Sequence, residues 1–337
     1  MGVAAQDSGK TVMVSTLADG TGRCAQTFDP SGIAIDNADN IYVADVYNHN
    51  IYKISPKGAM SLFTDGKGSD DQILYPIGIA VDDKTGNLYV VDQGNFRIRK
   101  VTSNGAVSTL AGTGGLCCEL GGGLLGHYAD GAGSVAGFSS PHGIAIDAAG
   151  NLYVADAGNN CIRKITPKGD VSTLAGSGEK GFADGSGSTA RFNDPVGIAI
   201  DAAGNLYVAD KSNQRIRKVS PTGDVSTLAG SGEEGFADGA GSVAQFRHPF
   251  DITVDKLGNL YVADSGNQRI RKVTPEGDVS TIAGGGQGFA DGSGSEAMFN
   301  WPYGIAIDAA GNLYVADGYN RRIRKLVFVG RSSPEKE

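Results

Sequence analysis

The sequence predicts an all-β fold, a six-bladed β-propeller with four-stranded blades, and three observations carry this prediction. One template recurs six times along the chain. Each copy contains four short apolar runs between turn residues, without a helical period, which is typical of β-strands. Six copies of four strands correspond to a six-bladed propeller. The last copy lacks its fourth run, and a matching run stands near the N-terminus. The copies begin at Pro30, Pro76, Pro141, Pro195, Pro249 and Pro302, which are 46, 65, 54, 54 and 53 residues apart.

The copy that begins at Pro195 illustrates the four strands in order. Residues 198–200 form the first strand and residues 206–209 the second, and Asp-Ala-Ala-Gly-Asn between them is a turn of residues that accept a left-handed backbone. The third strand runs over residues 215–219. A Pro-Thr-Gly turn precedes the fourth strand, residues 225–229.

The two ends of the chain predict how the ring closes. The sixth copy stops after its third strand, residues 322–327, whereas Val-Ser-Thr-Leu-Ala at residues 14–18 repeats the fourth strand at residues 225–229. We therefore expect the N-terminal strand to complete the last blade and cover its open edge. The expected domain is a single propeller over residues 12–328, with residues 1–11 and 329–337 as flexible tails.

Composition and charge narrow the function. The chain of 337 residues has 52 glycines, as expected of a turn-rich fold, and no apolar run long enough for a transmembrane helix, so no membrane insertion is expected. The net charge of -8 argues against a nucleic-acid footprint over the whole surface. We expect a monomer. The first residues lack a signal-peptide core, so a secreted, periplasmic or cell-surface location requires a signal that has already been removed.

The repeated motifs identify a family resemblance. The blades read PxGIAIDxxGNLYVAD, NxRIRKV and VSTLAG, which resembles NHL repeats in their glycine-rich bacterial form, over roughly residues 12–328. This resemblance implies a propeller. NHL-type propellers serve as interaction scaffolds, as RNA-binding domains in some animal proteins and, in a related branch, as metal-dependent lyases.

Charged residues that recur in every blade predict scaffold roles. Arg-Ile-Arg-Lys begins at Arg97, Arg215, Arg269 and Arg322, and arginines packed between blades need carboxylates. The expected carboxylates are Asp92, Asp156, Asp210, Asp264 and Asp317. The Asp-Gly-x-Gly connectors at Asp130, Asp184, Asp238 and Asp291 lack the ligand spacing of an EF-hand and are expected to form Asx turns.

The residues that flank each repeat proline differ from blade to blade. They stand just before the innermost strand, at the expected mouth of the central channel, where scaffold drift and ligand selection are the two alternatives. We predict a ligand-binding mouth formed by Tyr75, His142, His248, Phe250, Asp251, Trp301 and Tyr303. The longest connector, around Cys117, is expected to contribute to ligand binding at this mouth. Cys24, Cys117, Cys118 and Cys161 have no evident pairing.

A metal site is a second hypothesis for the same residues. Pro141-His142-Gly143 resembles the Pro-His segments that carry zinc ligands in peptidylamidoglycolate lyases, but Ser31 and Phe250 replace two of those ligands. His142, His248 and Asp251 together could instead hold zinc with an open position.

The predicted function is a non-enzymatic binding scaffold for a protein, peptide or carbohydrate, without a cofactor. The alternatives are a metal-dependent lyase or lactone hydrolase that uses zinc or calcium, and an RNA-binding domain.

Overall fold

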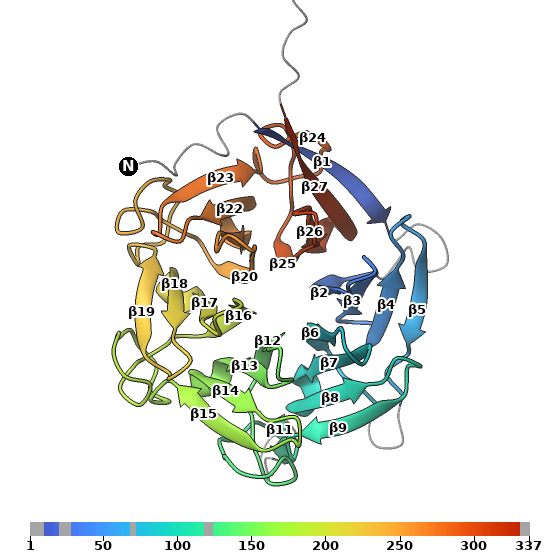
Figure 1. Ribbon diagram of the computed structural model, residues 1–337, viewed down its shortest axis with the longest axis vertical. Helices are drawn as coiled ribbons and strands as arrows, with labels where there is room; N and C mark the ends of the chain where they lie inside the picture. The colour runs from blue at the N-terminus through green and yellow to red at the C-terminus, as the bar shows by residue number, and fades with distance from the viewer. Residues whose placement is uncertain (1–9, 20–27, 68–71, 118–123, 331–337) are drawn as a thin grey trace, which may run out of the picture.

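The computed structural model describes residues 10–19, 28–67, 72–117 and 124–330, and it is a ring of six antiparallel sheets around a central channel (Figure 1). The predicted all-β, six-bladed propeller is therefore confirmed. Within each blade the strands follow one another from the channel outward. Most of residues 1–11 and 329–337, the expected tails, lies outside the described residues.

Blades 1 to 5 contain four consecutive strands each. Blade 1 has β2 (Pro30–Ile35), β3 (Ile41–Asp45), β4 (Asn50–Ile54) and β5 (Met60–Thr64). Blade 2 has β6 (Pro76–Asp82), β7 (Asn87–Asp92), β8 (Arg97–Val101) and β9 (Val107–Ala111). Blade 3 has β12 (Pro141–Ile146), β13 (Leu152–Asp156), β14 (Cys161–Ile165) and β15 (Val171–Ala175). Blade 4 has β16 (Pro195–Ile200), β17 (Leu206–Asp210), β18 (Arg215–Val219) and β19 (Val225–Ala229). Blade 5 has β20 (Pro249–Val254), β21 (Leu260–Asp264), β22 (Arg269–Val273) and β23 (Val279–Ala283).

Blade 6 joins the two ends of the chain. It contains β25 (Pro302–Ile307), β26 (Leu313–Asp317), β27 (Arg322–Gly330) and β1 (Lys10–Asp19), with the short β24 (Gly292–Ser293) outside β1. Strand β1 pairs antiparallel with β27 from Lys10 opposite Gly330 to Asp19 opposite Arg322 (Figure 1). The prediction that the N-terminal strand closes the ring is confirmed.

Short elements connect the strands. A hairpin in the longest connector consists of β10 (Leu116–Cys117) and β11 (Leu124–Leu125). A single 3-10 turn follows the second strand in blades 2 to 6: η1 (Gln93–Asn95), η2 (Ala157–Asn159), η3 (Lys211–Asn213), η4 (Ser265–Asn267) and η5 (Gly318–Asn320). None of the helical turns in the described residues is long and apolar enough to cross a bilayer.

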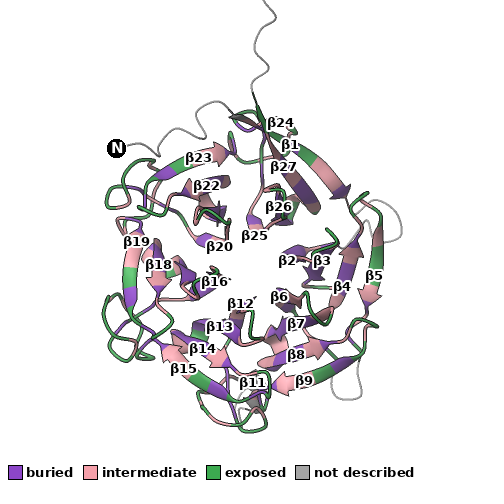
Figure 2. Ribbon diagram, viewed as in Figure 1, coloured by how far each residue is buried: buried purple, intermediate pink, exposed green. Residues whose placement is uncertain are grey.

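The hydrophobic core lies between neighbouring blades, and Figure 2 shows the buried positions along their strands. The cluster between blades 3 and 4, for example, packs Tyr153 and Ile162 against Phe192 and Leu206. Strand β1 contributes Val12 and Val14 to the cluster between blades 5 and 6. It contributes Ala18 to the cluster between blades 6 and 1, so the closing strand supports two blade interfaces.

The second arginine of the Arg-Ile-Arg motif is fully buried and forms an ion pair with the aspartate that ends the second strand. The predicted structural pairing is confirmed. The nitrogen–oxygen distances are 2.7 Å for Arg163–Asp156, Arg217–Asp210, Arg271–Asp264 and Arg324–Asp317, and 3.4 Å for Arg99–Asp92.

The connector aspartates have a different role from the Asx turns predicted for them. Asp184 lies 2.6 Å from Arg217 and accepts hydrogen bonds from the backbone N–H and hydroxyl of Thr227 on β19. The connector is thereby fixed to the blade that follows it. The same contacts recur for Asp130, Asp238 and Asp291.

Of the four cysteines, Cys161 is buried in β14 as a free thiol, and burial raises its pKa. A thiol in this state is a poor nucleophile. Cys24 and Cys118 lie outside the described residues.

Candidate ligand-binding site at the channel mouth

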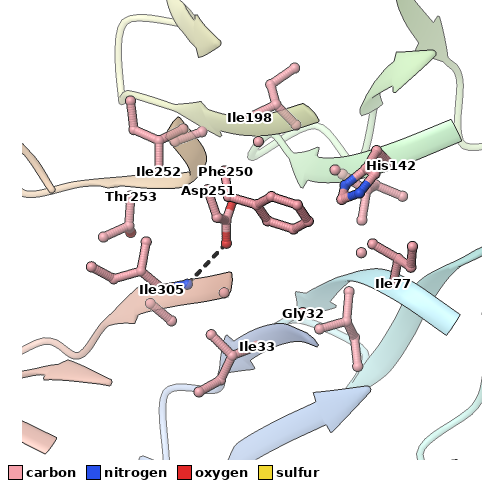
Figure 3. Close-up of a pocket in the computed structure, with 18 of the residues that line it drawn as sticks. Gly32, Ile33, Ile77, His142, Ile198, Phe250, Asp251, Ile252, Thr253 and Ile305 are labelled. Atoms are coloured by element: carbon pink, nitrogen blue, oxygen red, sulfur yellow. Dashed lines mark hydrogen bonds between the residues drawn. The ribbon is translucent and has the colours of Figure 1, made fainter. Parts of the chain in front are cut away.

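The first strands of all six blades surround a central cavity of about 220 Å³ (Figure 3). Its walls are mainly isoleucine side chains and glycine backbone. The polar side chains among the described lining residues are Ser31, His142, Asp251 and Thr253, and this lining includes neither lysine nor arginine. The cavity is therefore a tube walled by isoleucine side chains and strand backbone, with one acidic side chain among its described lining residues.

Close packing of the first strands explains the glycine of the Pro-x-Gly motif. A Cβ added to Gly304 would lie 2.1 Å from the carbonyl oxygen of Ser31 in the next blade, and one added to Gly78 would lie 2.2 Å from that of His142. Blade 5 carries Asp251 at this position. In blade 5 the pairing of the first two strands begins one residue earlier, because Asp251 pairs with Ala263, whereas in the other blades it resumes one residue later and in the same register.

The Asp251 carboxylate lies in the channel. One of its oxygens accepts a hydrogen bond of 3.0 Å from the backbone N–H of Ile305 in blade 6 (Figure 3). Desolvation raises the pKa of Asp251 to about 7, although the backbone N–H groups of Ile305 and Ile252 oppose the shift. The carboxyl group therefore titrates near neutral pH.

His142 also lines the cavity, on β12 across from blade 5 (Figure 3). Desolvation lowers its pKa to about 4, so its imidazole is neutral at pH 7. Its ring packs edge-on against Phe250, with ring centroids 4.9 Å apart. His142 and Phe250 thus bring blades 3 and 5 into contact at the entrance of the tube.

Aromatic rings continue from this entrance onto the rim. The Phe250 and Tyr303 centroids are 4.7 Å apart, Tyr303 and Trp301 are 6.5 Å apart, and Trp301 and His248 stack at 6.5 Å. We call His142, Phe250, Tyr303, Trp301 and His248 the aromatic arc. It collects five of the seven predicted site residues into one set of ring contacts.

Sequence reasoning missed two tyrosines that border the arc. Tyr319 contacts both Trp301 and Tyr303, at 6.0 and 6.1 Å, and is exposed. Tyr47 contacts Tyr75 in blade 2 at 6.2 Å. Burial and the hydroxyl of Tyr319 raise the pKa of Tyr303, with smaller contributions from Tyr47 and Asp29. Tyr75, the sixth predicted residue, is exposed and belongs to this second group of rings.

The backbone of the rim is held by a clamp that the sequence analysis also missed. The residue before the repeat proline has a positive φ in blades 2 to 6, between 44° and 57°. In four of these blades its N–H donates to a side chain of the preceding blade. The donor and acceptor pairs are Tyr75 to His49 (3.1 Å), Asp194 to Asn160 (3.2 Å), His248 to Gln214 (2.8 Å) and Trp301 to Gln268 (2.6 Å).

The acceptors share one place in the repeat, which is the signal that could have revealed them. Each follows the asparagine that precedes the third strand and has a left-handed backbone, as at Gln214 with φ of 54° and Gln268 with φ of 58°. Because the positive φ before the proline recurs in five of the six blades, this backbone geometry at the rim is a property of the scaffold. Only the side chains displayed there are specific to each blade.

The metal hypothesis receives no support from the geometry. In the described part of the chain, no three histidine, cysteine, aspartate or glutamate side chains are grouped so that they could hold a metal ion. His142 and Asp251 line the cavity, whereas His248 is on the rim against Trp301.

The connector around Cys117 lies elsewhere. Its hairpin strand β11 is at the outer edge of the ring, near β9 and β15 (Figure 1). The tip of the hairpin, residues 118–123, lies outside the described residues.

Curated relatives match parts of the ring. NHL repeat-containing protein 2 of Homo sapiens is 35% identical over 188 residues, which is 51% of this chain and 26% of that protein. Protein SUPPRESSOR OF QUENCHING 1, chloroplastic, of Arabidopsis thaliana is 30% identical over 218 residues, 59% of this chain and 21% of that protein. The chain thus spans about a quarter or less of the length of these relatives.

Solved structures share the fold at low identity. An auxiliary nutrient binding protein from Bacteroides ovatus aligns with a TM-score of 0.69 at 19% identity, over 95% of this chain and 77% of that one. A gluconolactonase from Xanthomonas campestris aligns with a TM-score of 0.63 at 15% identity, over 94% of this chain and 90% of that one. A streptogramin B lyase aligns with a TM-score of 0.60 at 14% identity, over 95% of this chain and 98% of that one.

The NHL repeat model matches once in each blade, at residues 29–53, 74–101, 138–165, 192–219, 246–273 and 299–326. With six NHL repeats closed into a six-bladed β-propeller, this chain belongs to the NHL-repeat proteins.

Proposed function

We propose that the protein is a non-enzymatic binding module that holds a peptide or carbohydrate ligand at the mouth of its channel. The observation that carries this proposal is the aromatic arc. Its rings are in mutual contact, partly accessible, and adjoin the central cavity through His142 and Phe250. Aromatic rings supply apolar contact area with little conformational freedom to lose on binding.

The backbone clamp supports this interpretation. Trp301 and His248 are fixed through their N–H groups to glutamine side chains of the preceding blades. The rings are therefore held in place before a ligand arrives, which lowers the entropy cost of association. Among solved structures of this fold, the auxiliary nutrient binding proteins of Bacteroides are named for a binding role, whereas the lyases and the gluconolactonase are named as enzymes. The fold is therefore compatible with both classes of function, and the residues of the site must distinguish them.

The basic motif does not favour RNA binding. The second arginine of the motif is fully buried in five blades and is neutralised by aspartate. The lysine that follows packs on a tyrosine ring, as Lys218 does on Tyr207 at 5.8 Å. Both side chains serve the scaffold.

The test is a double substitution, Trp301→Ala with Tyr303→Ala, after a peptide and glycan array has supplied a ligand. We expect affinity to fall by about 2 kcal/mol or more, roughly 30-fold, with an unchanged unfolding transition. The control is Phe236→Ala, which removes an exposed ring that packs on Arg269 in an outer connector. Equal affinity of the double variant and the wild type would refute the proposed mouth.

A further inference from the structure

We propose that the tube beneath the aromatic arc binds an ammonium group on a short apolar stem, with Asp251 as its counter-ion. This inference rests on the proposed function and specifies the chemistry of its ligand. The arc would receive the body of the ligand, and the tube would receive the charged end.

The first argument is the state of the Asp251 carboxylate. The buried carboxylates of blades 2 to 6 have a guanidinium partner, such as Arg217 at 2.7 Å from Asp210. Asp251 is held only by the backbone N–H groups of Ile305 and Ile252 among the described residues. An enclosed carboxylate without a cation is costly, and a cationic ligand removes that cost.

The second argument is charge selection by the surrounding wall. The described lining contains one acid, one imidazole and no lysine or arginine. Near His142, Lys211 is paired with Asp194 at 2.7 Å. An anionic ligand would therefore meet a carboxylate and no lysine or arginine of the described cavity lining, whereas an ammonium group would be attracted.

The third argument is the shape and chemistry of the tube. Isoleucine side chains from the six blades surround the cavity, and the Phe250 ring lies beside Asp251 at its entrance (Figure 3). A cation close to an aromatic face gains electrostatic energy in addition to its ion pair. A volume of about 220 Å³ corresponds to roughly seven waters at ~30 Å³ each, which is enough for a stem of about five carbons with its ammonium.

Asp251 also stands where the other five blades have glycine. A Cβ at those positions would meet the backbone of the next blade at 1.9 to 2.5 Å, whereas blade 5 accommodates a side chain there, at a residue that pairs directly with Ala263. The repeat thus departs from its own template at the one residue that places a charge in the channel.

The experiment measures binding of n-pentylamine and n-pentanol to the full chain by ligand-observed NMR at pH 8. We expect the amine to bind at least tenfold more tightly than the alcohol. Asp251→Asn keeps an oxygen for the Ile305 N–H and should abolish this preference. Asp224→Asn, which removes an exposed acid on an outer turn, should preserve it.

A second arm distinguishes the two sources of an ammonium group. Nα-acetyl-lysine methylamide presents a lysine side chain as a peptide would. Tighter binding than n-pentylamine would assign the tube to a lysine of a peptide, and weaker binding would assign it to a free amine. Equal binding of n-pentylamine and n-pentanol, or an amine preference that survives Asp251→Asn, would overturn the inference.

The outcomes separate this inference from the proposed function. If the aromatic arc does not bind the ligand, Trp301→Ala with Tyr303→Ala leaves the affinity for array ligands unchanged. If the arc binds the ligand but the tube does not bind an ammonium group, that double variant loses affinity while Asp251→Asn does not change the preference for amines.

Discussion

The blade interiors and the channel mouth use the same repeat in opposite ways. In the interiors one pair recurs with nearly constant geometry, from Arg163–Asp156 to Arg324–Asp317, each at 2.7 Å. At the mouth the backbone recurs, with a positive φ before the proline in five blades, but the side chains there differ. Residues that hold neighbouring blades together are constrained in every copy. Residues that face the channel mouth can differ without loss of the ring.

Blade 1 sharpens this contrast because it has lost the arginine. Tyr52 occupies the register position of Arg217 and packs edge-on against Phe28 at 5.8 Å. Asp45 remains buried, and desolvation raises its pKa. A well-packed ring can therefore replace the cation, as expected where burial of a charge pair costs nearly as much as the pair gains.

The largest expected effect is the loss of ring closure. Deletion of residues 1–19 removes β1, which leaves β27 as an open edge and takes Val12, Val14 and Ala18 from two core clusters. We expect aggregation or a melting temperature lower by more than 10 °C, measured by light scattering and calorimetry. Deletion of residues 1–9 alone is the control. An unchanged melting curve for the longer deletion would contradict closure by β1.

The next effect concerns the buried arginines. Arg217→Met leaves Asp210 and Asp184 without their cation, and we expect a loss of about 3 to 5 kcal/mol in the free energy of unfolding. Arg215→Met removes a partly exposed arginine that packs on Phe182, at a cost of about 1 kcal/mol or less. Urea titrations compare the two variants. Similar losses for both would mean that the buried pairs are not what the blades depend on.

A smaller effect is the pH dependence that the channel adds. The pKa of Asp251 is raised to about 7. Its favourable contribution to the free energy of unfolding is therefore complete below about pH 4 and is lost as the pH rises through 7. The pKa of His142 is lowered to about 4. Its contribution to the free energy of unfolding is therefore present above pH 6.5 and is lost as the pH falls through 4.

These two groups are separable by substitution. Asp251→Asn should gain about 1 to 3 kcal/mol over the wild type between pH 4 and 8, and His142→Phe should gain a similar amount between pH 6.5 and 4. Denaturant titrations at several pH values measure both slopes. A variant that follows the wild-type curve throughout would show that its group is solvated in the folded protein.

The smallest expected effect is on the backbone clamp. Gln268→Ala removes the acceptor for the Trp301 N–H and should cost about 1 kcal/mol in stability. It should also weaken ligand binding at the arc, because Trp301 is no longer held before binding. Gln287→Ala, which removes an exposed side-chain bond to Asn300, serves as the control. Identical ligand affinity in both variants would argue against the role of the clamp.

Particular residues show how far the sequence could predict the site. The positions that flank the prolines did identify the arc, since Trp301, Tyr303, Phe250, His248 and His142 are in mutual contact. They also included Val196, which is buried in the core between blades 4 and 5. Tyr319 and Gln268 were missed because their roles depend on contacts with other segments, and the only signal was the place that Gln268 shares with the other acceptors in the repeat.

The sequence by itself determined the number of blades, the strands in each and the closure by the first strand. These features depend on local alternation and turn residues, which repeat along the chain and need no distances. The tertiary structure alone decided that Asp251 accepts a hydrogen bond from the Ile305 N–H and that His142 and Phe250 meet across the channel, because these placements depend on how closely six strands from distant segments converge. The clamp between blades is of the same kind, since its donors and acceptors are 26 to 34 residues apart in the chain and meet only when neighbouring blades pack against each other.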